Sequence, residues 1–283
     1  MYLFVIDIGN TAIKFGIFDN CYLKSVYQFI YKNNIDNQLE TEIKYFETKN
    51  GLNKKNCTAV VISSVVPKLN NKFNKIIKDL LGQFPVLVNH KNANIKIHYK
   101  NPEQLGTDRI VNAIACYELF GGPSIIIDFG TTTTFDCIDK NGEFLGGIII
   151  PGIDMSLKTL NKFTAKLPYI PVSTAITDIP QDIIGHSTDE CIINGIQLGY
   201  TGMVNNIIVT LLKKMGSKTK VIATGGIMNT LFINQKQNKS TYLFGMNKID
   251  NFVPHLTLYG LKYFYFRRKN TNKKNFFKGL DKN

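Results

Sequence analysis

Two short stretches of the sequence have the residue types needed to hold phosphate. Residues 7–11 read Asp-Ile-Gly-Asn-Thr and residues 128–132 read Asp-Phe-Gly-Thr-Thr, each after a run of apolar residues. A glycine in a tight turn lets backbone N–H groups approach a phosphate, and neighbouring hydroxyls add hydrogen bonds. Asp7 and Asp128 would face nucleotide phosphates through a bridging cation, because a bare carboxylate repels them. Lys14, shortly after the first turn, could neutralise a phosphate oxygen. Either turn alone is compatible with an ordinary β-turn, but the pair favours a nucleotide site.

A third cluster, Gly-Thr-Asp-Arg at 106–109, lies where a loop enters an apolar helix. Asp108 could accept a proton, and Arg109 could hold a polar or anionic substrate. The alternative is that Asp108 only caps the helix while Arg109 is solvated. Residues 223–226, Ala-Thr-Gly-Gly, follow a strand and suit the close approach of a nucleoside, or form a plain turn before a helix. The residues alone leave these alternatives open.

Alternating strands and helices must position these motifs. Hydrophobic runs bounded by turn residues predict strands, and Asn141-Gly142 predicts a hairpin into residues 143–151. The other strands are expected at 2–8, 12–18, 22–30, 57–66, 85–88, 95–98, 124–129, 131–139 and 220–226. The helices, predicted from apolar residues at helical spacing, are expected at 69–81, from about 106, at 188–214 and at 255–267.

The repeated aspartate turn divides the chain into two related halves. Each turn ends one hydrophobic strand and opens the next, and a hairpin-like meander follows both. This duplication predicts two related α/β domains that face each other across a cleft. We expect them at residues 1–118, with the first turn and the cluster at 106–109, and at 119–283, with the second turn and the long helix.

The composition excludes several classes of protein. With 44% hydrophobic and 19% charged residues, the chain is neither disordered nor fibrous. No stretch reaches the roughly 18 to 20 consecutive apolar residues of a membrane span, and the N-terminus lacks the basic start of a secretory signal. The five cysteines form no CxxC pair, which predicts scattered core thiols in a reducing compartment. We therefore expect a cytoplasmic protein without a membrane partner.

The net charge of +13 is concentrated at the C-terminus. From Lys262 onward there are eight basic residues and one acidic residue. Such a tail can mark contact with nucleic acid or a membrane surface. No aromatic-interleaved RNA motif or zinc-finger spacing accompanies it, so a frayed basic terminus is favoured and no nucleic-acid partner is expected.

Several common catalytic motifs are absent: GxGxxG, GxxxxGK[ST], GxSxG and HExxH. The motifs that are present resemble those of type III pantothenate kinases, in the superfamily of acetate and sugar kinases, Hsp70 and actin. The resemblance rests on DIGNTAIKFGIFD, YKNPEQLGTDR, IDFGTTTTFD, GGIIIPG, TAKLP and ATGG, in this order between residues 7 and 226. Two departures are a longer segment after TAKLP and His186 and Ser187 where the family has a basic residue and asparagine before Thr188.

The resemblance implies actin-like (ribonuclease H-like) domains and phosphorylation of pantothenate by ATP to 4′-phosphopantothenate, the first step of coenzyme A biosynthesis. Asp108 corresponds to the catalytic acid/base, and Asp128 to the residue that holds a monovalent cation, K⁺ or NH₄⁺, with Mg²⁺ accompanying ATP. The implied ATP-binding residues are Asp7, Ile8, Gly9, Asn10, Thr11, Ala12, Ile13, Lys14 and Thr131. The implied substrate-binding residues are Tyr99, Gly106, Thr107, Asp108, Arg109 and Thr188, the last from a second subunit of a homodimer.

Two other functions stay open at this point. Another small-molecule kinase of the same superfamily would share both turns, and only the cluster at 106–109 favours pantothenate. A non-enzymatic, nucleic-acid-binding regulator would rest on the basic tail alone. ATP consumption that depends on pantothenate separates the enzyme from the regulator.

Overall fold

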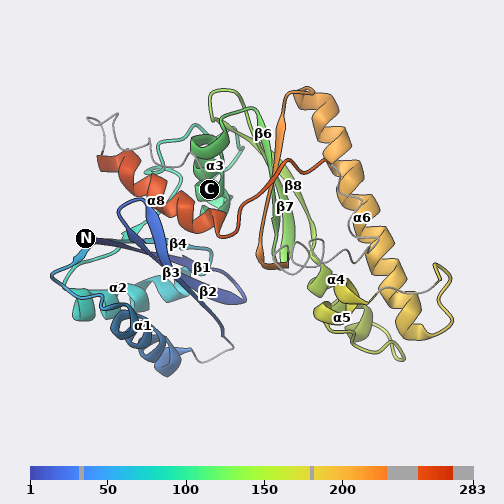
Figure 1. Cartoon of the computed structure of the whole chain (residues 1–283), viewed down its shortest axis with the longest axis horizontal. Coiled ribbons are helices and arrows are strands. Elements are labelled where there is room, and N and C mark those ends of the chain that lie inside the picture. Colours follow the sequence, from blue (N-terminus) through green and yellow to red (C-terminus); the bar gives the residue numbers. More distant parts are fainter. Residues whose placement is uncertain (32–34, 179–181, 228–247, 270–283) are drawn as a thin grey trace. The chain divides into compact units, whose positions relative to one another are not determined.

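The computed structural model describes residues 1–31, 35–178, 182–227 and 248–269 (Figure 1). The chain divides into two compact units, one made of Met1–Leu119 and Thr257–Asn283 and the other of Phe120–Leu256. Each unit contains a five-stranded mixed sheet with helices against it, so the expected α/β class is confirmed. The last helix groups with the first unit, whereas the sequence-based limits of 1–118 and 119–283 place it with the second.

The first sheet is built around the strand that leads into the first aspartate turn. β1 (Tyr2–Ile8), β2 (Ala12–Asp19) and β3 (Tyr22–Ile30) form an antiparallel meander. On the other side of β1, β4 (Cys57–Ser64) and β5 (Val86–Leu87) run parallel to it. The order across the sheet is therefore β3-β2-β1-β4-β5.

Helices cover both faces of this sheet (Figure 1). α1 (Asp36–Asn50) and α2 (Pro67–Leu81) pack on one face, where a core of aromatic and branched aliphatic side chains is fully buried. On the other face lie α3 (Thr107–Phe120) and α8 (Leu256–Lys269). A Cβ on Gly16 of β2 would lie 2.9 Å from the Cδ1 atom of Leu258 in α8, so a larger residue here would force side chains to shift.

The second unit repeats the same plan. β6 (Ser124–Phe129), β7 (Thr132–Ile138) and β8 (Phe144–Pro151) form the antiparallel meander. β9 (Lys220–Thr224) pairs in parallel with β6, and β10 (Asn251–Phe252) pairs in parallel with β9. The order β8-β7-β6-β9-β10 matches that of the first sheet strand for strand, which confirms the duplication inferred from the two turns.

One face of the second sheet is covered by α4 (Ile153–Lys162), α5 (Val172–Thr177) and the long helix α6 (Thr188–Met215). Figure 1 shows α6 extending along the sheet and beyond it, toward α4 and α5. The prediction of a long helix at 188–214 is thus confirmed to within one residue.

The sequence-based assignment of elements is wrong at one strand and leaves out three α-helices and the short strand β10. The strand expected at 95–98 is reduced to a single bridge at residue 97, and Asn94 just before it has a left-handed φ of 50°. The helices α1, α4 and α5 were not predicted. The hairpin at Asn141-Gly142 is confirmed, with Gly142 at a φ of 80°.

Two expectations about individual side chains need correction. Cys191 is exposed and Cys21 half-buried, so only three of the five free cysteines are core thiols. Lys262 is not part of a solvated basic tail: its side chain is 3% exposed, and its ammonium lies over the ring of Tyr263 with a centroid distance of 4.5 Å. Among the described residues, no helix is long and apolar enough to cross a membrane.

Candidate active site

The first aspartate turn is a two-residue loop between β1 and β2. The strands stay paired as far as Ile8 and Ile13, and the Gly9 N–H then donates to the Ala12 carbonyl at 3.0 Å. Asn10 and Thr11 are exposed at the tip. The side chains of Ile8 and Ile13 are fully buried, so any contact of theirs with a nucleotide is made by the backbone.

Asp7 and Lys14 are directly opposite each other just before this loop. Opposed residues of antiparallel strands have Cβ atoms about 4.5–5.5 Å apart on the same face of the sheet. The half-buried carboxylate and ammonium are therefore neighbours at the end of the hairpin, next to the exposed turn. This arrangement can neutralise phosphate charge and can contribute one oxygen ligand to a divalent cation.

The second aspartate turn is one residue tighter. Phe129 pairs with Thr133, and the Gly130 N–H donates to the Thr132 carbonyl at 3.2 Å, which leaves Thr131 exposed at the tip. Asp128, the equivalent of Asp7, lies half-buried at the end of β6. The duplicated motif therefore produces two turns of related but unequal shape.

Two glycines from elsewhere in the second unit pack against this turn. A Cβ on Gly152, at the start of α4, would lie 2.5 Å from the carbonyl oxygens of Gly130 and Thr131. A Cβ on Gly225, which has a φ of 107°, would lie 2.5 Å from the Phe129 carbonyl oxygen. Gly225 therefore meets the second turn directly, while no described atom lies within 4 Å of a Cβ on Gly226. Gly152 was missed as a site residue, although GGIIIPG contains it.

Thr107 fixes the cluster at 106–109 to the first sheet. Its hydroxyl donates to the Ser64 carbonyl at 3.1 Å, accepts from the Ser64 N–H at 2.9 Å and lies 3.0 Å from the Ser63 hydroxyl. Ser63 and Ser64 are the last residues of β4 and pair in register with Asp7 and Ile8 of β1. The start of α3 is thereby held beside the strand that carries the first aspartate turn.

Asp108 follows this attachment point. Its Oδ1 accepts a hydrogen bond of 2.8 Å from the Arg109 N–H, and a Cβ on Gly106 would lie 2.4 Å from the same oxygen. Burial raises the pKa of Asp108 above its ordinary value, although the hydrogen bond from the Arg109 backbone and the charge of Arg109 oppose the shift. A carboxylate with a raised pKa is a better proton acceptor. The Arg109 side chain is 8% exposed, so the solvated arginine of the capping alternative is not found.

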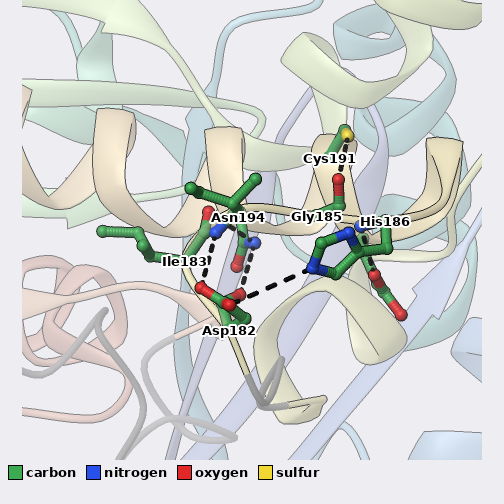
Figure 2. A network of polar contacts seen from close by, with 8 residues as sticks. Asp182, Ile183, Gly185, His186, Cys191 and Asn194 are labelled. Carbon is green, nitrogen blue, oxygen red and sulfur yellow. Dashed lines mark hydrogen bonds and ion pairs between the residues drawn. The ribbon is translucent and has the colours of Figure 1, made fainter.

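Thr188 is the first residue of α6, and a network of polar contacts fixes this helix end (Figure 2). Ser187, the N-cap, accepts a hydrogen bond from the Glu190 N–H at 3.2 Å. The Glu190 carboxylate accepts one from the His186 N–H at 2.7 Å, which resembles a capping box with its second bond moved to the residue before the N-cap. Asn194 reaches back from the next turn and donates to the carbonyls of Asp182 and Ile183 at 2.9 and 3.0 Å. The departure from the family at residues 186 and 187 therefore still provides a defined helix start.

The Thr188 side chain is exposed and lines a cavity of about 600 Å³ between α4 and α6. Most of the other lining side chains are apolar, among them Met155, Leu160 and Ile196. Tyr200, further along α6, was not anticipated: its hydroxyl is hydrogen-bonded to that of Thr133 on β7, and burial raises its pKa to about 12. This contact ties α6 to the hairpin that carries the second turn.

Comparison with known proteins identifies the family. A sequence model of the type III pantothenate kinases matches residues 3–210. The chain belongs to the type III pantothenate kinase family. The resemblance seen in the motifs is thereby confirmed. The type III pantothenate kinase of Moorella thermoacetica is 36% identical over 267 residues, which are 94% of this chain and 99% of the relative. That of Persephonella marina is 37% identical over 224 residues, 78% of this chain and 86% of the relative.

Solved structures support the fold. The (R)-2-hydroxyglutaryl-CoA dehydratase component A of Acidaminococcus fermentans superposes with a TM-score of 0.58 at 12% identity, covering 95% of this chain and 98% of that one. At this identity the likeness concerns the two-domain actin-like fold alone, which agrees with the repeated strand order.

Within this pantothenate kinase, the predicted site residues fall into groups held by different elements. The first unit brings the turn at 7–14 and the cluster at 106–109 together through β4. The second unit carries Asp128 and Thr131 on its own turn and Thr188 on α6. Tyr99 is half-buried in the segment before η1 (Pro102–Gln104), which leads into the cluster at 106–109.

Proposed function

We propose that this chain phosphorylates pantothenate with ATP as the first step of coenzyme A biosynthesis, with Asp108 as its acid/base. The family membership supports the activity. The observation that carries the assignment of residues is the attachment of Thr107 to the end of β4. It supports the proposal because it holds the start of α3, which carries Asp108, beside the end of the strand that pairs with β1 and its aspartate turn.

The ATP phosphates are held in this proposal by the turn at 7–14, with Thr131 contributing from the second unit. Phosphoryl transfer proceeds through a loose transition state, so positioning and charge neutralisation supply most of the rate. Lys14 provides positive charge beside Asp7.

Mg²⁺ fits this arrangement as a companion of ATP. Among the described residues, no group of three or more histidine, cysteine or acidic side chains forms a ready-made metal site. Mg²⁺ is commonly held by one or two carboxylates together with substrate phosphates, and Asp7 offers such a carboxylate at the turn. The ion would supply charge neutralisation on the phosphates.

A monovalent cation, K⁺ or NH₄⁺, is assigned to Asp128. In register with Asp128 on β7 is Thr134, whose buried hydroxyl oxygen has no hydrogen-bond partner among the described residues. A carboxylate and an unpartnered hydroxyl on one face of the hairpin are oxygen ligands suited to a hard cation. This orphaned oxygen supports the assignment, and the cation would offset charge near the second turn.

The proton of the pantothenate hydroxyl passes to Asp108. A primary alcohol is far less acidic than a carboxylic acid, so Asp108 first orients the hydroxyl and collects its proton late in the transfer. Arg109, with its planar guanidinium, would hold a polar or anionic part of the substrate. Tyr99, Gly106 and Thr107 complete the substrate segment, and the Thr107 hydroxyl serves to fix its position.

Thr188 is proposed to reach the substrate of the other subunit in a homodimer. One side of α6 exposes Gly195, Gly199 and Gly202, and no described atom lies within 4 Å of a Cβ on any of them. Small residues at this spacing let a second helix approach closely. The apolar cavity beside Thr188 adjoins the same helix. We also place the enzyme in the cytoplasm, which its five free cysteines support.

The experiment that tests this function is formation of ADP and 4′-phosphopantothenate by the purified protein. We expect ADP release only when ATP, Mg²⁺ and pantothenate are all present, with the product identified by mass spectrometry. Sugars and acetate serve as alternative acceptors. ADP release that is independent of pantothenate, or faster with another acceptor, would contradict the proposal.

A further inference from the structure

Tyr31, the first residue after β3, makes two hydrogen bonds to the first aspartate turn. Its hydroxyl donates to the Gly9 carbonyl at 2.8 Å, and its backbone N–H donates to the Thr11 carbonyl at 3.3 Å. The ring is half-buried and packs against the core of the first unit. Burial raises the pKa of Tyr31, so its hydroxyl stays protonated and remains a donor at neutral pH. No motif of the sequence points to this residue.

These two bonds determine where the turn points its N–H groups. A trans peptide is planar, so its C=O and the N–H of the following residue point in opposite directions. When Tyr31 holds the Gly9 carbonyl, the Asn10 N–H is directed away from Tyr31. Holding the Thr11 carbonyl directs the Ala12 N–H in the same manner. N–H groups fixed in orientation before a ligand arrives bind it better, because no ordering has to accompany binding.

The second aspartate turn is held in another way. Its Thr131 carbonyl accepts a hydrogen bond of 3.2 Å from the Gly152 backbone N–H at the start of α4. At Thr131 the second turn is thus held by a backbone N–H, while at Gly9 the first turn is held by a phenol that a single substitution can remove.

We propose that Tyr31 is a positioning residue that fixes the peptide groups of the first turn for the phosphates of ATP. The inference rests on the proposed function, since it assumes that this turn holds ATP. It assigns to Tyr31 an effect on nucleotide affinity, without contact between the tyrosine and either substrate.

The test is Tyr31→Phe, which removes the hydroxyl and keeps the ring. The dissociation constant of a non-hydrolysable ATP analogue is measured by calorimetry in the presence of Mg²⁺. One neutral hydrogen bond has a net value that corresponds to a change of about threefold to tenfold. We expect this increase in the dissociation constant and a similar rise in KM for ATP, while KM for pantothenate and kcat at saturating ATP stay unchanged.

Tyr27→Phe is the matched control. Tyr27 lies on β3, four residues before Tyr31, and its hydroxyl donates to the Glu42 carboxylate at 2.5 Å, away from the turn. Loss of the Tyr27 hydroxyl removes a tyrosine hydrogen bond from the same unit, so we expect lower thermal stability with unchanged affinity for the ATP analogue.

Each outcome decides the question. Wild-type affinity in Tyr31→Phe, or equal weakening in both variants, would overturn the inference while leaving the proposed function intact. If the wild-type protein itself fails to bind the analogue, the proposed function and this inference both fall. Should Tyr31→Phe not fold, 4-fluorophenylalanine at position 31 replaces it, since fluorine fills the space of the hydroxyl without donating a hydrogen bond. The same threefold to tenfold weakening is then expected, and wild-type affinity would again overturn the inference.

Discussion

Replacement of Asp108 by asparagine separates catalysis from structure at the proposed acid/base. Asparagine keeps the size of the side chain and an oxygen that can accept the hydrogen bond from the Arg109 N–H. Because residue 106 is a glycine without a Cβ, the side chain at position 108 has space whether it is aspartate or asparagine. The substitution therefore removes the charge and the proton acceptor and little else.

The expected effect on folding follows from the raised pKa of Asp108. Because the folded protein holds this proton more tightly than the unfolded chain, the free energy of unfolding falls as the pH rises from the ordinary value of 3.8 through the raised one. Asparagine does not ionise, so this loss is absent in the variant. At neutral pH we expect the free energy of unfolding of Asp108→Asn to equal or exceed that of the wild type, to within about 1 kcal/mol.

The expected effect on rate is much larger. General acid–base groups contribute typically about 10²–10⁴-fold, which corresponds to about 2.7–5.4 kcal/mol of activation free energy. We expect kcat with pantothenate to fall by this factor, while the affinity for ATP changes little because other residues hold the nucleotide. Steady-state kinetics and urea unfolding on the same preparations measure both quantities. Near-normal kcat, or a variant that unfolds, would refute the role assigned to Asp108.

Three further predictions test the remaining parts of the site. Arg109→Lys keeps the charge but loses the planar fork, so KM for pantothenate should rise about tenfold or more, with ATP affinity as the unaffected control. K⁺ or NH₄⁺ should raise activity well above that in Na⁺ at matched ionic strength and saturating Mg²⁺; equal rates in the three salts would contradict the cation at Asp128. Mixed dimers of Thr188→Ala and Asp108→Asn subunits should recover part of the activity that each variant lacks, because one of their two sites is intact. Hybrids that form, as mass spectrometry can verify, but remain inactive would argue against a shared site.

The sequence predicts most of the framework on which the site is built. The repeated aspartate turns correctly predict a duplicated sheet, since the turn chemistry and the flanking apolar runs are local signals. The long helix at 188–214 is equally clear from its apolar spacing. By contrast, α1 was not predicted: polar residues dominate its 15 positions, and among its described side chains Leu39, Ile43 and Phe46 are the ones buried in the core. Such a helix depends on tertiary packing more than on its own pattern.

The contacts that position the site could not be predicted from the sequence, because they too depend on tertiary packing. Thr107 was expected to touch substrate, but whether its hydroxyl also binds Ser64 depends on a pairing between residues 43 positions apart. Tyr31 meets Gly9 only because the register of β3 on β2 brings them together across 22 positions. Sequence motifs identify residue types suited to chemistry, whereas register and packing decide which side chains support them.

The position of α8 has a consequence for how the protein is made. The first unit needs this helix, because Leu258 and Tyr259 pack on β2 and residue 260 lies against the backbone of α3. The second unit is continuous in the chain and ends at Leu256. The ribosome therefore synthesises the whole second unit before it synthesises α8, the helix that completes the first unit. Until then the part of the sheet face that α8 covers, around Gly16 and Phe18 of β2, stays uncovered, and the nascent chain depends on α8 to bury it.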